Sequence, residues 1–297
     1  MTAQQSPPAP VMAWAERTQG PLVVLRGAVT DLPLAPAWDV VRTGDGARLQ
    51  VRTALDPGAF TRETFAHRHA VPALGPGTAP RLLATSAAHL ALIVTTLPGT
   101  PLDELRMPEA DLRTVHWRAG HLLARLHQAA RHTGTAHHDA PTVLSRLADE
   151  AAAHLGTVGD RLSADERKRV TGLAERLRFA GRLPLGYIHG GPLGSCLLWS
   201  ADAQLALRDF ESTRFAPVVL DFVHLACGSW AIQPRLRTAF FTGYGRAPGH
   251  DEEIALRCLT ALTSARRLAE ARALGDQVAA AGWGVVLDRV YDEVCAR

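Results

Sequence analysis

Residue types that could carry chemistry gather in one stretch of the sequence, between residues 187 and 211. Its candidates include a histidine, a hydroxyl, a thiol and two of its carboxylates, at His189, Ser195, Cys196, Asp209 and Glu211. A cysteine acts as a nucleophile only as the thiolate, and His189 is the single neighbour that could activate Cys196. The pattern therefore disfavours covalent catalysis. Two roles fit Asp209, which precedes an aromatic residue. Its carboxylate either binds a cation or caps the turn that follows a hairpin.

Sequence motifs of three large enzyme classes are missing. The P-loop motif G-x-x-x-x-G-K-[ST] needs a lysine, and the only lysine, Lys168, lies in the charged run Asp165–Arg169. Neither H-E-x-x-H of the zinc metalloproteases nor G-x-S-x-G of the α/β-hydrolases occurs. The four cysteines form no C-x-x-C pair, which disfavours both a zinc ribbon and a disulfide-stapled secreted fold.

The composition is typical of a folded globular chain. Of the 297 residues, 47% are hydrophobic and 21% are charged, and 32 basic against 29 acidic residues give a net charge of +3. The charges form no block of one sign, so they predict no nucleic-acid partner. The sequence has neither a leader segment at its start nor a long uninterrupted apolar run, so we expect no membrane partner and a cytoplasmic location.

Hydrophobic patterning predicts an α+β fold in three parts: a flexible N-terminus at 1–19, a β-rich N-lobe at 20–98, and a mainly helical C-lobe at 99–297 that carries a hairpin region at 187–211. In the N-lobe we expect one helix and five strands, at Phe60–His69 and at Leu22–Leu25, Trp38–Arg42, Arg48–Arg52, Arg81–Ala84 and Leu90–Thr95. The run Leu97–Gly99 breaks the last strand as a linker would.

The C-lobe should be built from a series of amphipathic helices. Apolar residues recur at three- and four-residue steps in several segments, at Leu112–Leu126, Val143–Leu155, Ala164–Leu177, Val218–Ala231, Arg235–Tyr244 and Ile254–Leu274. Two short apolar runs interrupt this pattern, Cys196–Trp199 and Leu205–Leu207, and they predict a hairpin.

Five local motifs, in order along residues 20 to 280, resemble those of the aminoglycoside phosphotransferases. They are Gly120-His-Leu-Leu-Ala-Arg-Leu-His127, Tyr187-Ile-His-Gly190, Arg208-Asp-Phe-Glu211, Val219-Leu-Asp-Phe-Val-His-Leu-Ala226 and Phe240-Phe-Thr-Gly-Tyr-Gly245. Each motif alone is weakly specific, whereas five in the correct order are fairly specific. The resemblance implies a two-lobed protein-kinase-like fold that binds ATP or GTP with Mg²⁺.

The resemblance also implies roles for individual N-lobe residues and for the metal ligand. Asp209 would be the Mg²⁺ ligand, and Arg52 would take the place of the phosphate-holding lysine, paired with Glu63. The linker at Thr95 and Leu97 would offer backbone groups to an adenine edge.

Within the loop that would be catalytic, the resemblance implies two supporting residues and two departures. His189 would brace the loop by a hydrogen bond, and Asp221 would accept its backbone N–H groups. The family's usual base, an aspartate, is replaced by Gly191, and losing a positioned base forfeits ~10²–10⁴ in rate. The second metal ligand falls on Cys196 or Ser195, and a thiol is a poor ligand for Mg²⁺.

Two hypotheses for the function follow. In the first, the chain is a kinase-like protein with a degenerate catalytic loop, which binds nucleotide and acts as a pseudokinase or partner subunit, with natural-product biosynthesis as one setting. In the second, it is an active O-phosphotransferase that uses Asp209 with Mg²⁺ and Arg52 on phosphates, with either substrate assistance or a carboxylate such as Glu211 as proton acceptor. Its substrate would be a hydroxyl-bearing small molecule or Ser/Thr of a precursor peptide.

Overall fold

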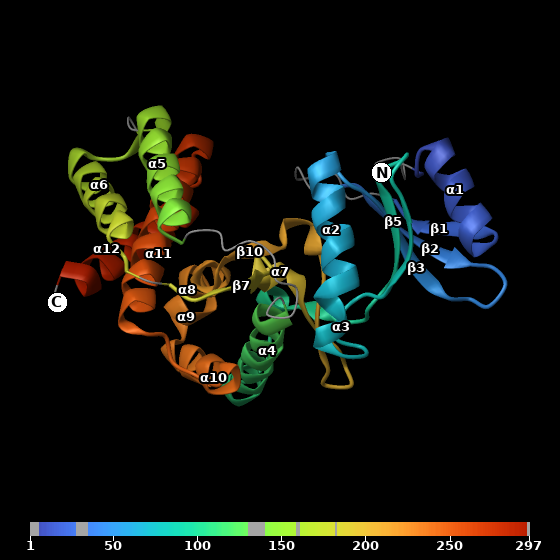
Figure 1. The fold of residues 1–297 in the computed structure, drawn as a ribbon. Coiled ribbons are helices and arrows are strands. Elements are labelled where there is room, and N and C mark those ends of the chain that lie inside the picture. The colour runs from blue at the N-terminus through green and yellow to red at the C-terminus, as the bar shows by residue number, and fades with distance from the viewer. Residues whose placement is uncertain (1–5, 28–34, 130–139, 159–160, 182, 296–297) are drawn as a thin grey trace. The chain divides into compact units, whose positions relative to one another are not determined.

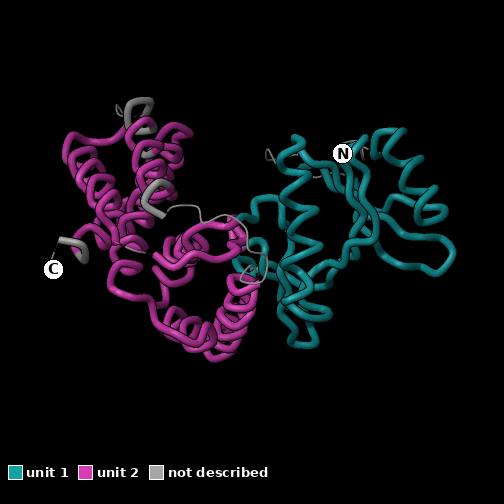
Figure 2. The backbone as a smooth tube through the Cα atoms, viewed as in Figure 1, with its two compact units in different colours: residues 1–104, 195–214 teal, residues 105–194, 215–297 magenta. Residues whose placement is uncertain are grey.

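The computed structural model describes residues 6–27, 35–129, 140–158, 161–181 and 183–295. Contacts between Cα atoms divide the chain into two compact units, coloured separately in Figure 2. Unit 1 comprises residues 1–104 and 195–214, and unit 2 comprises 105–194 and 215–297. The first unit thus runs slightly past the expected lobe boundary at residue 98. It also takes in most of the hairpin region, which the sequence assigned to the helical lobe.

Unit 1 is organised around an antiparallel five-stranded sheet of order β1-β2-β3-β5-β4. Its strands are β1 (Leu22–Arg26), β2 (Ala37–Arg42), β3 (Arg48–Thr53), β4 (Leu82–Ser86) and β5 (Ala91–Thr95), close to the predicted limits. Alternating apolar residues such as Val40, Leu49, Val51 and Ile93 are buried, as expected for strands with one face on a core.

The N-terminal segment is more ordered than its composition indicates. Helix α1 (Ala9–Gln19) packs on the sheet (Figure 1), with Val11 and Ala15 in the same core cluster as Trp38 and Val40. Met12 and Trp14, partly buried, pack against the same cluster, so four apolar residues of the helix dock it on the sheet.

Helix α2 (Pro57–His69) lies in unit 1 between β3 and β4 in sequence and supplies part of the site. Its start is fixed by Asp56, whose side chain accepts a hydrogen bond from the N–H of Ala59 at 2.8 Å. Glu63 and His67, four residues apart, share a buried face of this helix. A one-turn helix, α3 (Val71–Leu74), follows.

The predicted hairpin is present as β8 (Leu197–Trp199) and β9 (Leu205–Leu207), joined by β6 (Thr100–Pro101) into a small sheet of unit 1. The N–H of Leu207 donates to the carbonyl of Thr78 at 2.8 Å. After the hairpin the backbone turns sharply at Asp209, which has φ of 66° and precedes a 3-10 helix at Phe210–Ser212. A non-glycine residue in this left-handed region is uncommon and often marks a functional position.

Unit 2 is mainly helical. Its long helices are α4 (Glu109–Ala129), α5 (Ala140–Val158), α6 (Ala164–Arg178), α10 (Pro234–Tyr244), α11 (His250–Leu274) and α12 (Gln277–Cys295). The pair α4 and α10 approaches closely because Gly120 and Gly243 carry no side chain. A Cβ at Gly120 would lie 2.0 Å from the carbonyl oxygen of Phe240, and one at Gly243 would lie 1.8 Å from that of Trp117.

Two expectations about unit 2 are corrected. The segment Val218–Ala231, expected as one helix, is a 3-10 helix at Val218–Phe222 followed by α8 (Val223–Cys227) and α9 (Ser229–Ile232). The chain leaves helical geometry at Gly228, where φ is −102° and ψ is −107°. Helix α12 had no counterpart among the expected helices. Its own sequence includes two glycines, which disfavour a helix, and extensive packing on α11 compensates.

Two short strands and one short helix complete the framework of the expected catalytic loop. Strand β7 (Leu185–Ile188) pairs with β10 (Arg214–Pro217), and α7 (Leu193–Cys196) follows the loop. Across the described residues, no helix combines the length and the apolar character needed to span a membrane.

Candidate functional site

The expected site residues are divided between the two units. Those in unit 1 are Arg52, Glu63, Thr95, Leu97, Ser195, Cys196, Asp209 and Glu211. Those in unit 2 are His189 and Gly191, together with the supporting Asp221.

Arg52 lies at the end of β3 and is held by three carboxylates. Its Nη1 contacts Oδ1 of Asp209 at 2.5 Å, and its Nη2 contacts Oε2 of Glu211, also at 2.5 Å. The third partner is Glu63, whose Oε1 lies 3.4 Å from Nε. We call these four residues the Arg52 cluster. The predicted pairing with Glu63 is present, and the two contacts from the 209–211 turn are additional and shorter.

Two members of the Arg52 cluster, Arg52 and Glu63, are buried, whereas the side chains of Asp209 and Glu211 are 32% and 21% exposed. Burial alone would lower the pKa of Arg52, but the surrounding charges of Glu63, Asp209 and Glu211 outweigh it and raise that pKa. For Glu63, which is 1% exposed, burial dominates and raises the pKa to about 7, although Arg52 opposes the shift. Arg52 therefore stays charged, and its positive charge stabilises the ionised form of the carboxylates around it.

The second carboxylate oxygen of Asp209 also faces an arginine. Nε of Arg208 lies 3.2 Å from Oδ2 of Asp209, and Nη2 of Arg208 donates to the carbonyl oxygen of Ser195 at 3.2 Å. Arg208 is a site residue that sequence reasoning missed, although it is the first residue of a motif quoted above. Both oxygens of the expected metal ligand are thus engaged by guanidinium groups.

The position expected to hold a second metal ligand carries a buried thiol. Burial raises the pKa of Cys196 to about 12, so the thiol stays protonated, and its sulfur lies 4.0 Å from Oγ of Ser195. A neutral thiol does not suit Mg²⁺, which prefers hard oxygen ligands. Among the described residues, no group of three or more His, Cys, Asp or Glu side chains is arranged to hold a metal ion. At the second ligand position the chain therefore offers no donor that suits Mg²⁺, and the carboxylate expected as the first ligand, Asp209, is already paired with two arginines.

A cavity of about 470 Å³ lies in unit 1 beside the linker, and we call it the linker cavity. Thr95, Leu97 and their neighbours line it, together with apolar side chains that include Leu25, Val40 and Leu198. No other described residue bonds to the backbone N–H and C=O of Leu97, so both remain available to a ligand. The polar part of the lining includes three arginines, Arg26, Arg48 and Arg208.

In unit 2 the loop after β7 is anchored by Asp221, as expected. One carboxylate oxygen of Asp221 accepts the N–H of His189 and the other accepts that of Gly190, both at 2.7 Å. Nε2 of His127 lies 2.9 Å from Oδ2 of the same carboxylate. Burial would raise the pKa of Asp221, but His127, His189 and the Gly190 N–H outweigh it and lower that pKa.

Hydrogen bonds hold the backbone of the loop at Gly191, the position where the resemblance implies an aspartate. Gly190 has φ of 75°, and the N–H of Gly191 donates to Nδ1 of His189 at 3.2 Å. His127 extends the network to the hydroxyl of Tyr244 through its Nδ1, at 2.8 Å. Sequence reasoning quoted His127 and Tyr244 within motifs but gave them no role. Gly191 itself has no side chain that could accept a proton.

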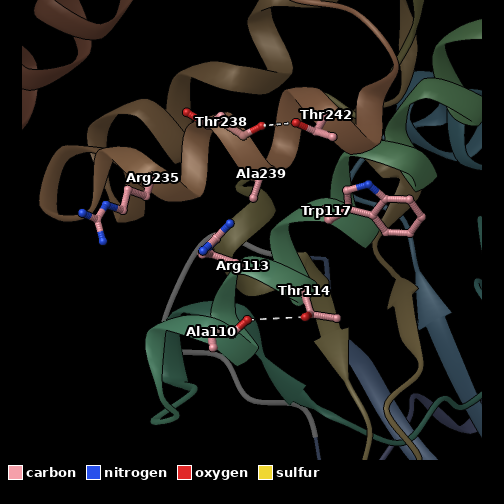
Figure 3. A pocket seen from close by; sticks show the side chains of 8 residues that line it. All are labelled: Ala110, Arg113, Thr114, Trp117, Arg235, Thr238, Ala239 and Thr242. Atoms are coloured by element: carbon pink, nitrogen blue, oxygen red, sulfur yellow. Dashed lines mark hydrogen bonds between the residues drawn. The ribbon is translucent and has the colours of Figure 1, made fainter.

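A second cavity, of about 590 Å³, is confined to unit 2 and contains no predicted site residue (Figure 3). It lies along α4 and α10, with Trp117 and Arg113 on the first helix and Arg235 on the second. Its threonines are turned to their own helices, since Thr114 and Thr242 donate to backbone carbonyls.

Comparison with known proteins decides the family. Residues 39–256 match the phosphotransferase enzyme family, which is well over half of the chain. The chain belongs to this family. No curated protein matches the sequence.

Solved structures of the family share its fold. An aminoglycoside phosphotransferase from Alicyclobacillus acidocaldarius superimposes with a TM-score of 0.66 at 18% identity, covering 99% of this chain and 96% of that one. The macrolide 2'-phosphotransferase MphH from Brachybacterium faecium gives 0.62 at 17%, covering 94% and 96%. A thermostable aminoglycoside phosphotransferase APH(4)-Ia, in a ternary complex with ADP and hygromycin B, gives 0.65 at 14%, covering 95% and 97%. The expected two-lobed kinase-like fold is confirmed.

Proposed function

We propose that this chain is a nucleotide-binding member of the phosphotransferase family that does not transfer phosphate, and that it acts as a pseudokinase or partner subunit. The observation that carries the proposal is the Arg52 cluster. An active enzyme would need Asp209 for a metal ion, Arg52 for phosphates and Glu211 as proton acceptor. In this structure these three groups are bonded to one another.

The loop of unit 2 supports the same reading. Its amide groups are anchored by Asp221, as an active loop would require, but Gly191 supplies no base. Phosphoryl transfer depends mainly on positioning and on charge stabilisation, so a missing base alone would slow the reaction without abolishing it. The missing base at Gly191 removes the proton acceptor. The pairing of Asp209 and Glu211 with Arg52 removes the groups that would stabilise charge during transfer.

Nucleotide binding is proposed from the linker cavity. A base ring fits between apolar side chains such as Val40 and Leu198, and the free N–H and C=O of Leu97 can pair with its edge. Related structures of the family were determined with ADP or GDP bound. A binding role leaves room for a hydroxyl-bearing small molecule, a peptide or a protein as the second partner, and a natural-product pathway is the setting we propose.

The proposal is tested by a thermal-shift titration with ATP combined with a phosphate-release assay. We expect ATP to raise the melting temperature and no release above background with hydroxyl-bearing substrates. Thr96→Trp, which fills the linker cavity, should abolish the shift, whereas Thr171→Trp on the exposed face of α6 should leave it unchanged.

Two outcomes would contradict the proposal. Turnover that Asp209→Ala abolishes would establish the alternative, an active O-phosphotransferase acting on a small molecule or on Ser/Thr of a precursor peptide. A melting temperature that does not respond to ATP, measured with and without Mg²⁺, would remove nucleotide binding from the function.

A further inference from the structure

We propose that arginine side chains, and not a divalent cation, supply the positive charge of this site, so that its ligand is a nucleoside di- or triphosphate bound without metal. The identity of the ligand rests on the function proposed above. The exclusion of the cation rests only on the contacts of the described residues.

The first step of the argument concerns the acids. A metal ion at Asp209 would have to share that carboxylate with Arg52 on one oxygen and with Arg208 on the other. Arg52 is 5% exposed, and drawing Asp209 toward a metal would weaken one of the two closest counter-charges of a buried guanidinium. The geometry therefore makes the guanidinium of Arg52 the resident counter-cation of Glu63, Asp209 and Glu211.

The second step concerns the ligand's own charge. In the family's chemistry a metal ion neutralises the phosphate oxygens. The linker cavity offers an alternative, because it is lined by Arg26, Arg48 and Arg208 against a single acid, Asp39. One oxygen of that acid, Oδ1 of Asp39, accepts a hydrogen bond from Nε2 of Gln50 at 3.1 Å, and three guanidinium charges still outnumber its one negative charge.

The third step concerns the kind of cation. No ion pair joins Arg26 or Arg48 to another described residue, so both guanidinium groups can meet an anion. A guanidinium is charged at every accessible pH and offers paired N–H donors that match phosphate oxygens. The only lysine of the chain, Lys168, lies in unit 2. Every cation of the unit 1 site that could grip phosphate is therefore an arginine.

The first experiment measures the dissociation constant of ATP for the full chain by calorimetry, once with EDTA and once with excess Mg²⁺. We expect the two constants to agree within about twofold. In EDTA, Arg48→Glu should weaken binding about tenfold or more, whereas Arg17→Glu, an exposed charge reversal on α1, should not. Tightening by Mg²⁺ of tenfold or more would overturn the inference, and so would an Arg48→Glu variant that binds normally.

The second experiment needs no nucleotide, so it separates this inference from the proposed function. Free Mn²⁺ is measured by electron paramagnetic resonance as the chain is added. We expect no stoichiometric loss of signal with the wild type. Binding of one Mn²⁺ per chain that Asp209→Asn abolishes would overturn the inference. If ATP fails to bind under either condition, the proposed function falls, and this titration still decides whether the site takes a cation.

Discussion

At the scale of single residues, Arg52 determines what the site can do. A lysine at the same position would present one compact ammonium group, which lacks the wide planar fork by which the guanidinium reaches separate carboxylates through different nitrogens. The three acids come from α2 and from the turn after the hairpin, and Arg52 joins them from β3. The residue that would grip phosphate in an active enzyme thus cross-links unit 1 instead.

A second residue beside the Arg52 cluster makes stability depend on pH. Burial lowers the pKa of His67 to about 4, and the charge of Arg52 adds to the effect. The unfolded chain takes up this proton near the ordinary pKa of 6.5, whereas the folded chain keeps the imidazole neutral until about pH 4. The free energy of unfolding should therefore fall by roughly 3 kcal/mol through His67 as the pH drops across this window.

The variant His67→Gln isolates this contribution, because it cannot take up the proton. Urea unfolding of wild type and variant at several pH values gives the difference in unfolding free energy. We expect the unfolding free energy of the wild type to fall relative to that of the variant between pH 6.5 and pH 4. Above pH 7 the difference between the two should be constant. Two parallel pH profiles would show that His67 does not carry the effect.

At the scale of elements, the close approach of α4 and α10 keeps the loop anchor in place. Helix α4 contributes His127 and α10 contributes Tyr244 to the network that ends on Asp221. The two helices can lie this close only because glycine stands at each contact, at Gly120 and Gly243. Backbone packing between helices therefore fixes the position of a side chain that holds the loop.

Gly243→Ala should consequently destabilise the chain, although alanine is the better helix former. Its Cβ would lie 1.8 Å from a backbone oxygen of α4, so the helices must separate, at a cost of about 3 kcal/mol or more. Gly172→Ala is the matched control, because Gly172 lies within α6 with no atom near its added Cβ. That control should stabilise by about 0.5–1 kcal/mol. Equal effects of the two substitutions in chemical denaturation would contradict this account.

At the scale of the whole molecule, unit 1 is made from two segments that are distant in sequence. Residues 195–214 supply the hairpin, Asp209, Glu211 and Phe210, a phenyl ring with no exposed surface. Residues 1–104 supply the sheet, α2 and Arg52. Neither the charge balance nor the core of unit 1 is complete until both segments have been synthesised.

The fragment 1–104 should for this reason fail to fold by itself. It keeps Arg52 but loses two of the three carboxylates that hold it, and it loses the aromatic ring that packs beside His67 at 5.4 Å. The same fragment joined to 195–214 by a flexible linker should show dispersed amide resonances and cooperative urea unfolding. Cooperative unfolding of 1–104 alone would contradict this prediction.

Much of this architecture follows from local sequence patterns. The five strands of unit 1, the hairpin and the anchoring of the loop by Asp221 were predicted, because apolar alternation and short motifs are local signals. The contact between Arg52 and Glu211 spans 159 residues and leaves no local signal. Helix α12 was missed for the opposite reason, since packing on α11 overrides weak local propensity.

The deeply buried sulfur of Cys196 has a consequence for the chain's chemistry in an oxidising cell. A protonated thiol that solvent cannot reach reacts with neither peroxide nor glutathione. Oxidative modification at this position has to wait until the packing that buries Cys196 opens. Folding therefore protects this thiol from oxidation, whereas a cysteine in an exposed loop would be open to it.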